Sequence, residues 1–426
     1  MAFPFSQLTP PADSGAAPTG TLEINVLSSA QNRPIDNATI DISYTGDPEG
    51  ILEEVHTDRE GHVTVPDLPT PPFAYSQEPF AEQPYSEYTL KISAPGYEPI
   101  IINSSQVLPD VTAIQNITLL PAPPGDPNTA ETFVIPANTL FGEFPPKIIE
   151  SEVKPMAESG EIVLPNVVIP EYIVVHDGLP QDSSANNYYV PYRDYIKNVA
   201  SSEIYATWPT QTIIANVLAI QSFTLNRVYT EWYRSKGYNF TITSSTAYDH
   251  KWVPERNIFD TIDRVVDDIF NFFLSRPNIK QPILTQYCDG KRVTCPGLMS
   301  QWGSKTLGDQ GLSAAEILRS FYGSSIYINE TNLVSGVPVS FPGTTLSIGS
   351  SGAEVRQLQE QLAEIADVYY SIPSLAIDGI YGPGTAASVT AFQEKFDLPV
   401  TGQVDQATWY KISAIYVAVT RIAEYV

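Results

Sequence analysis

The stretch from Asp194 to Thr230 constrains the fold most, because it predicts two apolar helices that meet at a corner holding one carboxylate. Apolar residues recur at helical spacing before the corner, and Pro209 suits the first turn of the helix that follows. Dense apolar residues from Ile213 to Leu225 predict a second helix buried on most of its circumference. Glu203 would lie between these helices, where burial raises the pKa of a Glu toward the range of a general acid. A solvated Glu that only flanks a helix end is the alternative.

Composition limits the classes of partner. The chain has 426 residues and a net charge of −25, from 48 acidic and 23 basic residues. Such a charge repels phosphate backbones, so we expect no nucleic-acid partner. No apolar run is long enough to span a bilayer, so we expect no membrane insertion. The first 20 residues have neither a basic region nor an apolar core, so we also expect no secretory signal peptide.

The N-terminal third changes character twice. Residues 1–19, rich in Pro, Ala, Ser and Gly, predict a flexible leader. From residue 20 to 120, apolar residues alternate with polar ones in short runs separated by turns, which predicts a small all-β sandwich. Residues 121–168 are rich in Pro and charge and lack sustained periodicity, so they predict a linker, with a short strand near Glu161 to Leu164.

Two cysteines, Cys288 and Cys295, flank an Asp-Gly turn signal in a segment that could form a short hairpin. A disulfide and two free thiols both fit this spacing. His250 is the only histidine close to this region, and a zinc site needs three or four converging ligands. We therefore expect no metal and no cofactor.

Two motifs resemble the catalytic segments of the stage II sporulation protein D family, which are lytic transglycosylases of peptidoglycan. The first is the Ser202-Glu203 pair followed by Trp208-Pro209 and an Ala-containing helix; the second is Met299-Ser300-Gln301-Trp302-Gly303. The resemblance implies an α+β catalytic domain over residues 169–343, with Glu203 as the catalytic acid. The chain departs from the family where the buried helix commonly carries Gln and Arg, since Asn216 and Gln221 stand there.

The same resemblance places the glycan beside a polar segment between the motifs and beside the second motif. An ordinary polar loop and a core tryptophan are the alternatives for these residues. The candidate substrate contacts are Ser245, Thr246, Tyr248, Asp249, Ser300, Gln301 and Trp302.

Residues 344–426 are similar to the three-helix peptidoglycan-binding domain. Asp378-Gly379 predicts a turn, Thr385 predicts the start of the next helix, and Thr408-Trp409 repeats the turn–helix unit in degenerate form. Residues 20–120 likewise resemble transthyretin-like modules, through the Asp58 to Gly61 turn and the Ala94-Pro95-Gly96-Tyr97 corner. The expected fold class is therefore multidomain: a β-sandwich, an α+β catalytic domain and a three-helix wall-binding domain.

The order of these parts resembles the spore cortex-lytic enzymes of the pre-pro type. The resemblance implies cleavage of the MurNAc–GlcNAc bond to 1,6-anhydro-muramic products, with glycan strands as the substrate and the spore cortex or coat as the location. It also implies a proenzyme that a serine-type germination protease activates, and the linker predicts the cut between about Phe141 and Pro170. Two alternatives remain: a linker that is only a spacer, and a non-enzymatic wall-binding protein that enhances another hydrolase.

Overall fold

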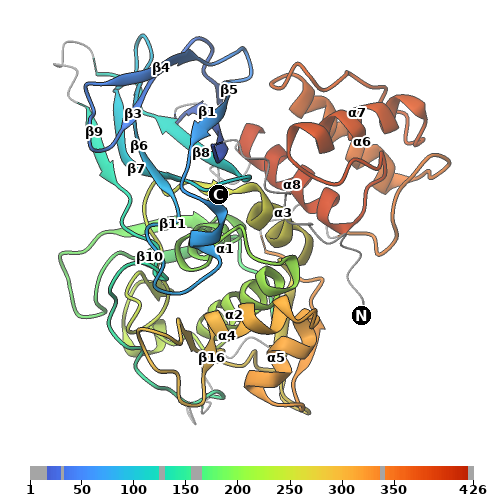
Figure 1. The fold of residues 1–426 in the computed structure, drawn as a ribbon. Coiled ribbons are helices and arrows are strands. Elements are labelled where there is room, and N and C mark those ends of the chain that lie inside the picture. Colours follow the sequence, from blue (N-terminus) through green and yellow to red (C-terminus); the bar gives the residue numbers. More distant parts are fainter. Residues whose placement is uncertain (1–16, 30–32, 124–129, 155–165, 336–340, 421–426) are drawn as a thin grey trace.

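The N-terminal part of the computed structural model, which describes residues 17–29, 33–123, 130–154, 166–335 and 341–420, contains two β-sheets (Figure 1). One sheet has the order β13-β8-β1-β2 with β5 also paired to β1, and the other has the order β4-β3-β6-β7-β9. Alternate residues of β1, such as Leu22, Ile24 and Val26, are buried, because successive side chains of a strand point to opposite faces. The buried faces of both sheets contribute to one apolar core. The expected β-rich N-terminal part is therefore confirmed.

The strands of these sheets are short, and one turn of 3-10 helix, Phe73–Ser76, follows β5. Their bounds are β1 Thr19–Ser28, β2 Arg33–Pro34, β3 Thr39–Tyr44, β4 Ile51–His56, β5 His62–Pro69, β6 Ser86–Ser93, β7 Ile100–Val107, β8 Thr112–Leu119, β9 Glu131–Val134 and β13 Ile258–Phe259.

The central part is organised around helix α2, Thr210–Tyr229, which contacts α1, α3, α4, α5 and β14. Every residue of α2 from Thr212 to Arg227 is buried, as its dense apolar pattern predicts. Helix α1, Tyr192–Glu203, ends at the corner before α2. The remaining elements are β10 Tyr172–His176, β11 Asn187–Pro191, the 3-10 turn Arg234–Lys236, β12 Ile242–Thr243, α3 Asp260–Ile269, β14 Phe272–Ser275, β15 Tyr287–Cys288, β16 Met299–Ser300, α4 Gln301–Asp309, α5 Ala314–Tyr322 and β17 Tyr327–Glu330.

The N-terminal and central parts share a sheet. Strand β13, which precedes α3, pairs antiparallel with β8 of the sandwich. Beside it, Asn257 and the backbone of Gln106 exchange two hydrogen bonds of 2.8 and 3.0 Å. The buried guanidinium of Arg256 donates to the side chain of Gln106 at 2.6 Å and to the carbonyl of Ser201 in α1 at 2.8 Å. Polar side chains thus connect the sandwich to the helix that carries Glu203.

The C-terminal part contains α6 Ala353–Ala366, α7 Pro383–Lys395 and α8 Gln406–Thr420, which confirms the expected helical end of the chain. A buried glutamine organises each half of it. Gln359 accepts from the N–H of Gly379 and donates to Thr385, while Gln393 accepts from the N–H of Gly402 and donates to Thr408. Both glycines have positive φ, 75° and 64°, which favours glycine at these turns. The degenerate turn–helix repeat expected from the sequence is therefore present.

Ion pairs attach the C-terminal part to both other parts. Lys411 of α8 pairs with the buried Asp267 of α3 at 2.8 Å, and Asp267 also pairs with Lys197 of α1 at 2.9 Å. Lys395 of α7 pairs with Glu60 of the sandwich at 3.0 Å. Among the described helices, none is both long enough and apolar enough to cross a membrane.

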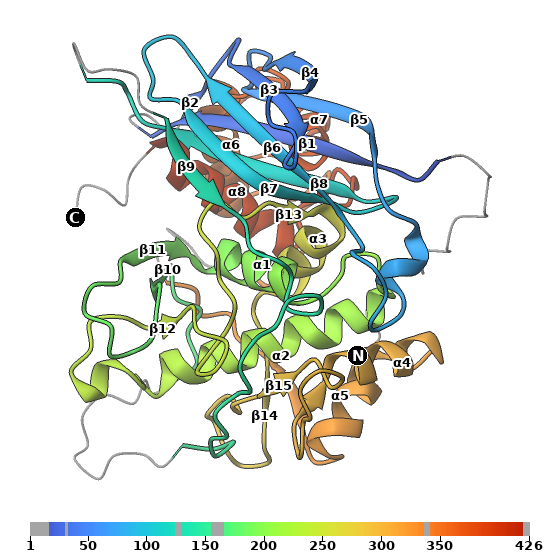
Figure 2. The same ribbon diagram turned by 60° about the vertical axis from the view of Figure 1, so that its left-hand side comes forward.

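The region expected to be a linker is bound to the rest of the chain. Strand β9 adds to the sandwich by pairing parallel with β7. Residues 135–154, here called the covering segment, then pass along α1 and α2 to the far end of the central part (Figure 2). Four backbone or side-chain bonds from Asn138 and Thr139 reach residues 201–204, at the end of α1 and just after it. The predicted strand at Glu161 to Leu164 lies outside the described residues.

Candidate functional site

Glu203 is the last residue of α1, and its side chain is buried, with 2% of the residue exposed. The backbone N–H of Lys251 donates to Oε1 at 2.6 Å, and the hydroxyl of Tyr287 donates to Oε2. Its own carbonyl accepts from the side chain of Gln301 at 3.0 Å. The carboxylate is therefore fixed in orientation by donors from two distant segments of the chain.

Burial and neighbouring groups shift the pKa of Glu203 in opposite directions. Burial raises its pKa, and the ammonium of Lys147 lowers it, with smaller lowering from the Tyr287 and Lys251 bonds. The net pKa is above the ordinary value. The partial negative charge at the end of α1 acts in the same direction as burial. A carboxyl with a raised pKa keeps its proton to a higher pH than an ordinary Glu, which suits a general acid.

Glu203 lies in a pocket with about 490 Å³ of empty space, including solvent at its mouth. The walls come from the covering segment, from Glu203, from Thr246 and from the segment between Tyr287 and Gln301. The lining residues are Thr139, Gly142, Phe144, Pro145, Lys147, Glu203, Thr246, Tyr287, Cys288, Asp289, Arg292, Val293 and Gln301. The covering segment therefore forms a wall of the same pocket that contains the candidate acid.

Aromatic rings pack against Tyr287 and Lys147, two residues that line the pocket. Tyr287 stacks on His250 with ring centroids 5.8 Å apart, and His250 contacts Phe223 at 4.4 Å. The hydroxyl of Tyr195 and Nδ1 of His250 are 3.0 Å apart, while burial lowers the pKa of His250 well below its ordinary value. The ammonium of Lys147 lies over the rings of Phe223 and Tyr287, at 5.1 and 4.8 Å from their centroids. Lys147 thus occupies a cation-favouring position beside Glu203.

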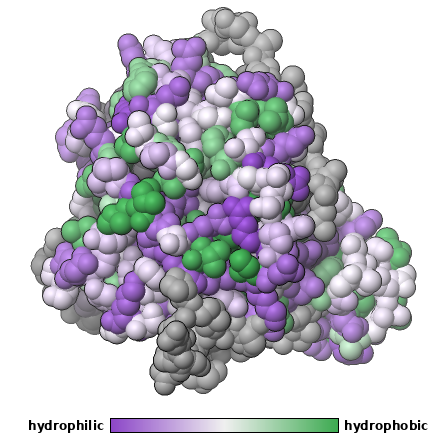
Figure 3. Space-filling view, turned by 90° about the horizontal axis from the view of Figure 1, so that it is seen from below, coloured by the Kyte–Doolittle hydropathy of each residue, from purple (hydrophilic) through white to green (hydrophobic). Residues whose placement is uncertain are grey.

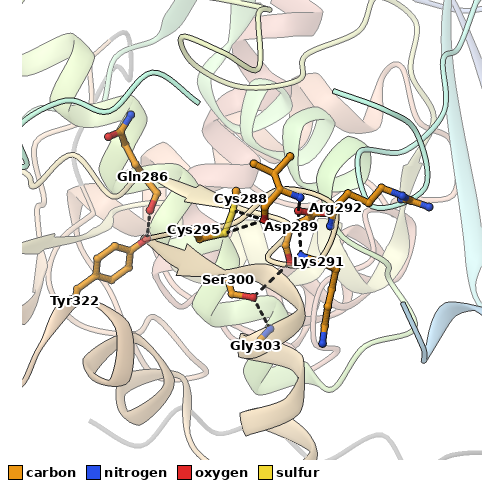
Figure 4. Close-up of a disulfide and its surroundings, with 10 residues drawn as sticks. Gln286, Cys288, Asp289, Lys291, Arg292, Cys295, Ser300, Gly303 and Tyr322 are labelled. Carbon is orange, nitrogen blue, oxygen red and sulfur yellow. Dashed lines mark hydrogen bonds between the residues drawn. A yellow bond between two sulfur atoms is a disulfide. The ribbon is translucent and has the colours of Figure 1, made fainter. Parts of the chain in front are cut away.

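Cys288 and Cys295 form a disulfide with a Cα–Cα distance of 5.8 Å, which decides between the two alternatives that the sequence left open (Figure 4). Strand β15 pairs parallel with β16, and the segment is a closed loop, not the hairpin that the turn signal suggested. Inside the loop, Asp289 accepts from the backbone N–H groups of Arg292 and Val293 at 2.8 and 2.9 Å. The disulfide and Asp289 together shape one wall of the pocket.

The structure brings some of the predicted contact residues to the pocket. Thr246 and Gln301 line it. The side chain of Gln301 also donates to the carbonyl of Glu203 at the end of α1. Ser245 lies one residue before Thr246, where its carbonyl accepts from the N–H of Asp249 at 2.7 Å. The carbonyl of Tyr248 accepts from Arg227 at 3.1 Å.

The other predicted contacts serve the framework of the site. The buried carboxylate of Asp249 accepts from Arg227, Tyr233 and Thr243, so its oxygens are already engaged. Ser300 caps α4 by accepting from the N–H of Gly303 at 2.9 Å. Trp302 is 4% exposed and packs against other aromatic rings, which is the core role that the sequence left as its alternative.

Sequence reasoning missed Tyr287, Lys147 and Asp289. Their positions depend on long-range folding, since Tyr287 lies 84 residues from Glu203. The Asp289-Gly290 turn signal and the neighbouring cysteines marked the segment, but not its approach to the acid. Within the described residues, no group of three or more His, Cys, Asp and Glu side chains is placed to hold a metal ion.

Comparison with known proteins gives a match at the C-terminal end. Residues 351–412 match the family described as "Putative peptidoglycan binding domain". A 68-residue stretch is 46% identical to the zinc D-Ala-D-Ala carboxypeptidase of Streptomyces albus G, and it covers 16% of this chain and 26% of that relative. This chain thus spans about a quarter of that protein's length.

Solved structures also match in part. The SleB N-terminal domain is 32% identical over 18% of this chain and 97% of its own, with a TM-score of 0.16. The 5-hydroxyisourate hydrolase of Klebsiella pneumoniae is 17% identical over 24% of this chain and 92% of its own, with a TM-score of 0.17. The family match shows that the C-terminal helical part is a peptidoglycan-binding domain.

Proposed function

We propose that the chain is a lytic transglycosylase of spore cortex peptidoglycan, stored as a proenzyme. One observation carries the proposal: the buried carboxyl of Glu203, with a raised pKa, lies in a pocket of a chain that binds peptidoglycan through its C-terminal domain. Thr246 and Gln301 line this pocket and are the predicted contacts that we retain for the glycan. Seen from below (Figure 3), the surface is mostly polar with separate hydrophobic groups.

The proposed reaction uses one carboxyl group twice. Protonated Glu203 donates its proton to the glycosidic oxygen as the C1–O bond of muramic acid breaks. The resulting carboxylate accepts the proton of the muramic C6 hydroxyl, whose oxygen bonds to C1 and closes the 1,6-anhydro ring. No water is consumed, and the nucleophile belongs to the substrate, so a second carboxylate is not required. Tyr287 and the N–H of Lys251 hold the carboxylate in place through both steps.

The product identifies the reaction. Mass spectrometry of digested cortex should show 1,6-anhydro-muramic ends, and Glu203→Gln should abolish cleavage while binding to peptidoglycan stays unchanged. Reducing-end sugars would instead indicate hydrolysis. Wall binding without any sugar cleavage by the processed protein would favour the non-enzymatic enhancer.

The covering segment supports storage as a proenzyme. It forms a wall of the pocket and places the ammonium of Lys147 where it lowers the pKa of Glu203. Removal of Lys147 would raise the pKa of Glu203 further and open the space beside the rings of Phe223 and Tyr287. The sequence predicts the cut between about Phe141 and Pro170. A serine-type germination protease that cleaves after Lys154, within this range, would allow the segment to leave.

An engineered cut tests the storage hypothesis. Residues 155–165 are replaced by the recognition sequence of a site-specific protease, and cortex digestion is followed before and after the cut. We expect little activity from the intact chain and full activity after cleavage. Equal activity before and after the cut would mean that residues 121–168 are only a spacer.

A further inference from the structure

The covering segment is bound in the way that proteins bind an extended peptide. The side-chain amide of Gln286 accepts from the N–H of Glu150 at 2.9 Å and donates to the carbonyl of Ile148 at 2.7 Å. The amide of Gln281 does the same for the N–H and carbonyl of Lys154, at 2.7 and 3.2 Å. Both glutamines are buried. The central part thus recognises the backbone of the segment at two points.

Two arginines of the central part recognise its carboxylates. Arg227 of α2 contacts Glu150 through two hydrogen bonds of 2.6 and 3.1 Å. Arg276, which follows β14, contacts Glu152 through two bonds of 2.5 and 2.7 Å. Paired bonds between a guanidinium and a carboxylate are among the strongest and most directional in proteins. The arginines and glutamines, together with the N–H of Leu284 that donates to the carbonyl of Glu152 at 2.8 Å, are here called the peptide surface.

If the segment left, the groups of the peptide surface would be exposed to water. Arg227 would keep Asp249 but lose the second carboxylate, and the amide of Gln286 would lose both partners. A ligand that offers backbone amides and two carboxylates at similar positions would match the donors and acceptors that become available.

We propose that in the processed enzyme the peptide surface binds the carboxylate-bearing stem peptide of peptidoglycan, and that the covering segment occupies the surface by presenting the same groups. This inference rests on the proposed function. The location agrees, because Lys147 reaches the Glu203 pocket only three residues before Glu150. A muramic acid cleaved at Glu203 would carry its stem peptide onto the same surface.

Arg276→Gln tests the inference in the protein processed at the engineered site. Two substrates are compared: glycan strands that carry stem peptides, and strands from which an amidase has removed them. We expect kcat/KM to fall about ten-fold on peptide-bearing strands, since two charged bonds are lost, and to stay unchanged on stripped strands. The matched control is Arg264→Gln, which removes an exposed arginine paired with Asp260 on α3.

Equal losses on both substrates would mean that Arg276 has only a structural role and would overturn the inference. A second readout does not need catalysis. Processed Glu203→Gln protein is titrated with a muramyl peptide by calorimetry, and binding should weaken about ten-fold when Arg276→Gln is added. If neither substrate is cleaved but this peptide binding is found, the proposed reaction fails while the peptide surface stands. If the processed parent protein and its Arg276→Gln variant cleave both substrates equally well, the inference about the peptide surface fails while the proposed reaction stands.

Discussion

Glu203 shows how a single residue depends on sequence and on tertiary structure. Its place at the corner of two apolar helices follows from local periodicity, and the structure buries it there. The hydroxyl of Tyr287 and the backbone N–H of Lys251, which hold its carboxylate, come from segments 84 and 48 residues away. No spacing rule connects such residues, so the donor set could not be predicted. The same holds for the contact between Gln301 and the end of α1.

Tyr287→Phe should change the pH dependence of cleavage. The tyrosine hydroxyl donates to the Glu203 carboxylate and lowers its pKa, so its removal raises that pKa. A general acid must be protonated, and activity therefore falls as the pH rises through the pKa of Glu203. We expect the alkaline limb of the kcat/KM profile of the processed enzyme to move to higher pH, with a lower maximum.

The matched control is Tyr192→Phe in α1, the helix that ends at Glu203. The buried hydroxyl of Tyr192 has no hydrogen-bond partner among the described residues. Its pH profile should coincide with that of the parent protein. A Tyr287→Phe profile that moves to lower pH would show that the hydroxyl does not stabilise the anionic form of Glu203.

At the scale of elements, the disulfide between Cys288 and Cys295 constrains one loop of the site covalently. Its closure fixes Asp289, Arg292 and Val293, all of which line the pocket. Replacing both cysteines by serine should lower the free energy of unfolding by about 2 to 3 kcal/mol, the chain-entropy value for a loop of this length. We also expect a lower kcat on cortex, because the wall of the pocket is less fixed.

Denaturant unfolding and steady-state cleavage measure these two effects. The single variant Cys295→Ser should behave like the double variant, since either change opens the loop. Unchanged stability and activity in both variants would show that Asp289 and its backbone bonds hold the loop without the disulfide.

The covering segment is the element that the sequence predicted least well. Its Pro-rich and charged composition is typical of a linker, because no apolar period announces packing. Its attachment instead depends on polar groups spaced for particular partners, such as Glu150 for Arg227 and Glu152 for Arg276. Composition cannot reveal such a match, since the partners lie 77 and 124 residues away.

Glu150→Gln combined with Glu152→Gln should therefore loosen the segment in the intact chain. Glu152→Gln leaves Arg276 without its carboxylate, and Glu150→Gln removes one of the two carboxylates that Arg227 contacts. We expect basal cortex cleavage without proteolysis to rise at least about ten-fold. Glu143→Gln, an exposed carboxylate of the same segment, is the control. If the double variant shows no basal activity, the segment does not owe its position to these two pairs.

For the whole molecule, the order of a β-rich part and a helical peptidoglycan-binding part could be predicted, because each has a regular period or a repeated turn. The contacts between the parts could not. Strand β13 contributes only Ile258 and Phe259 to the sandwich, and two residues carry no detectable pattern. The ion pair between Lys395 and Glu60 joins residues more than 300 positions apart.

Stability of the intact chain should depend on pH in part through two half-buried carboxyls, Glu23 and Glu255. Burial, and then Asp397, raise the pKa of Glu23 to about 6, while burial, and then Glu131, raise the pKa of Glu255 to about 7. Between the unfolded pKa near 4.5 and these values, the folded chain binds more protons than the unfolded chain. Their stabilising contribution is therefore complete below about pH 4.5 and is lost as the pH rises through 6 to 7.

Thermal unfolding measured from pH 5 to pH 8 checks this. We expect Tm to fall over this range, and Glu23→Gln with Glu255→Gln to flatten the dependence. Glu53→Gln, an exposed residue of β4, should leave the curve unchanged. A Tm that rises toward pH 8 in the parent protein would contradict the assigned direction.

Arg256 has a consequence for how the three regions come apart. Burial lowers its pKa to about 10, so it stays charged at neutral pH, yet its bonds go to the neutral side chain of Gln106 and the carbonyls of Pro136 and Ser201. Hydration is worth more to a cation than neutral acceptors in a dry contact. If the chain is cut as proposed and the surfaces separate, water hydrates this guanidinium, and reassociation would require removing that water again. We therefore expect the separation to be irreversible.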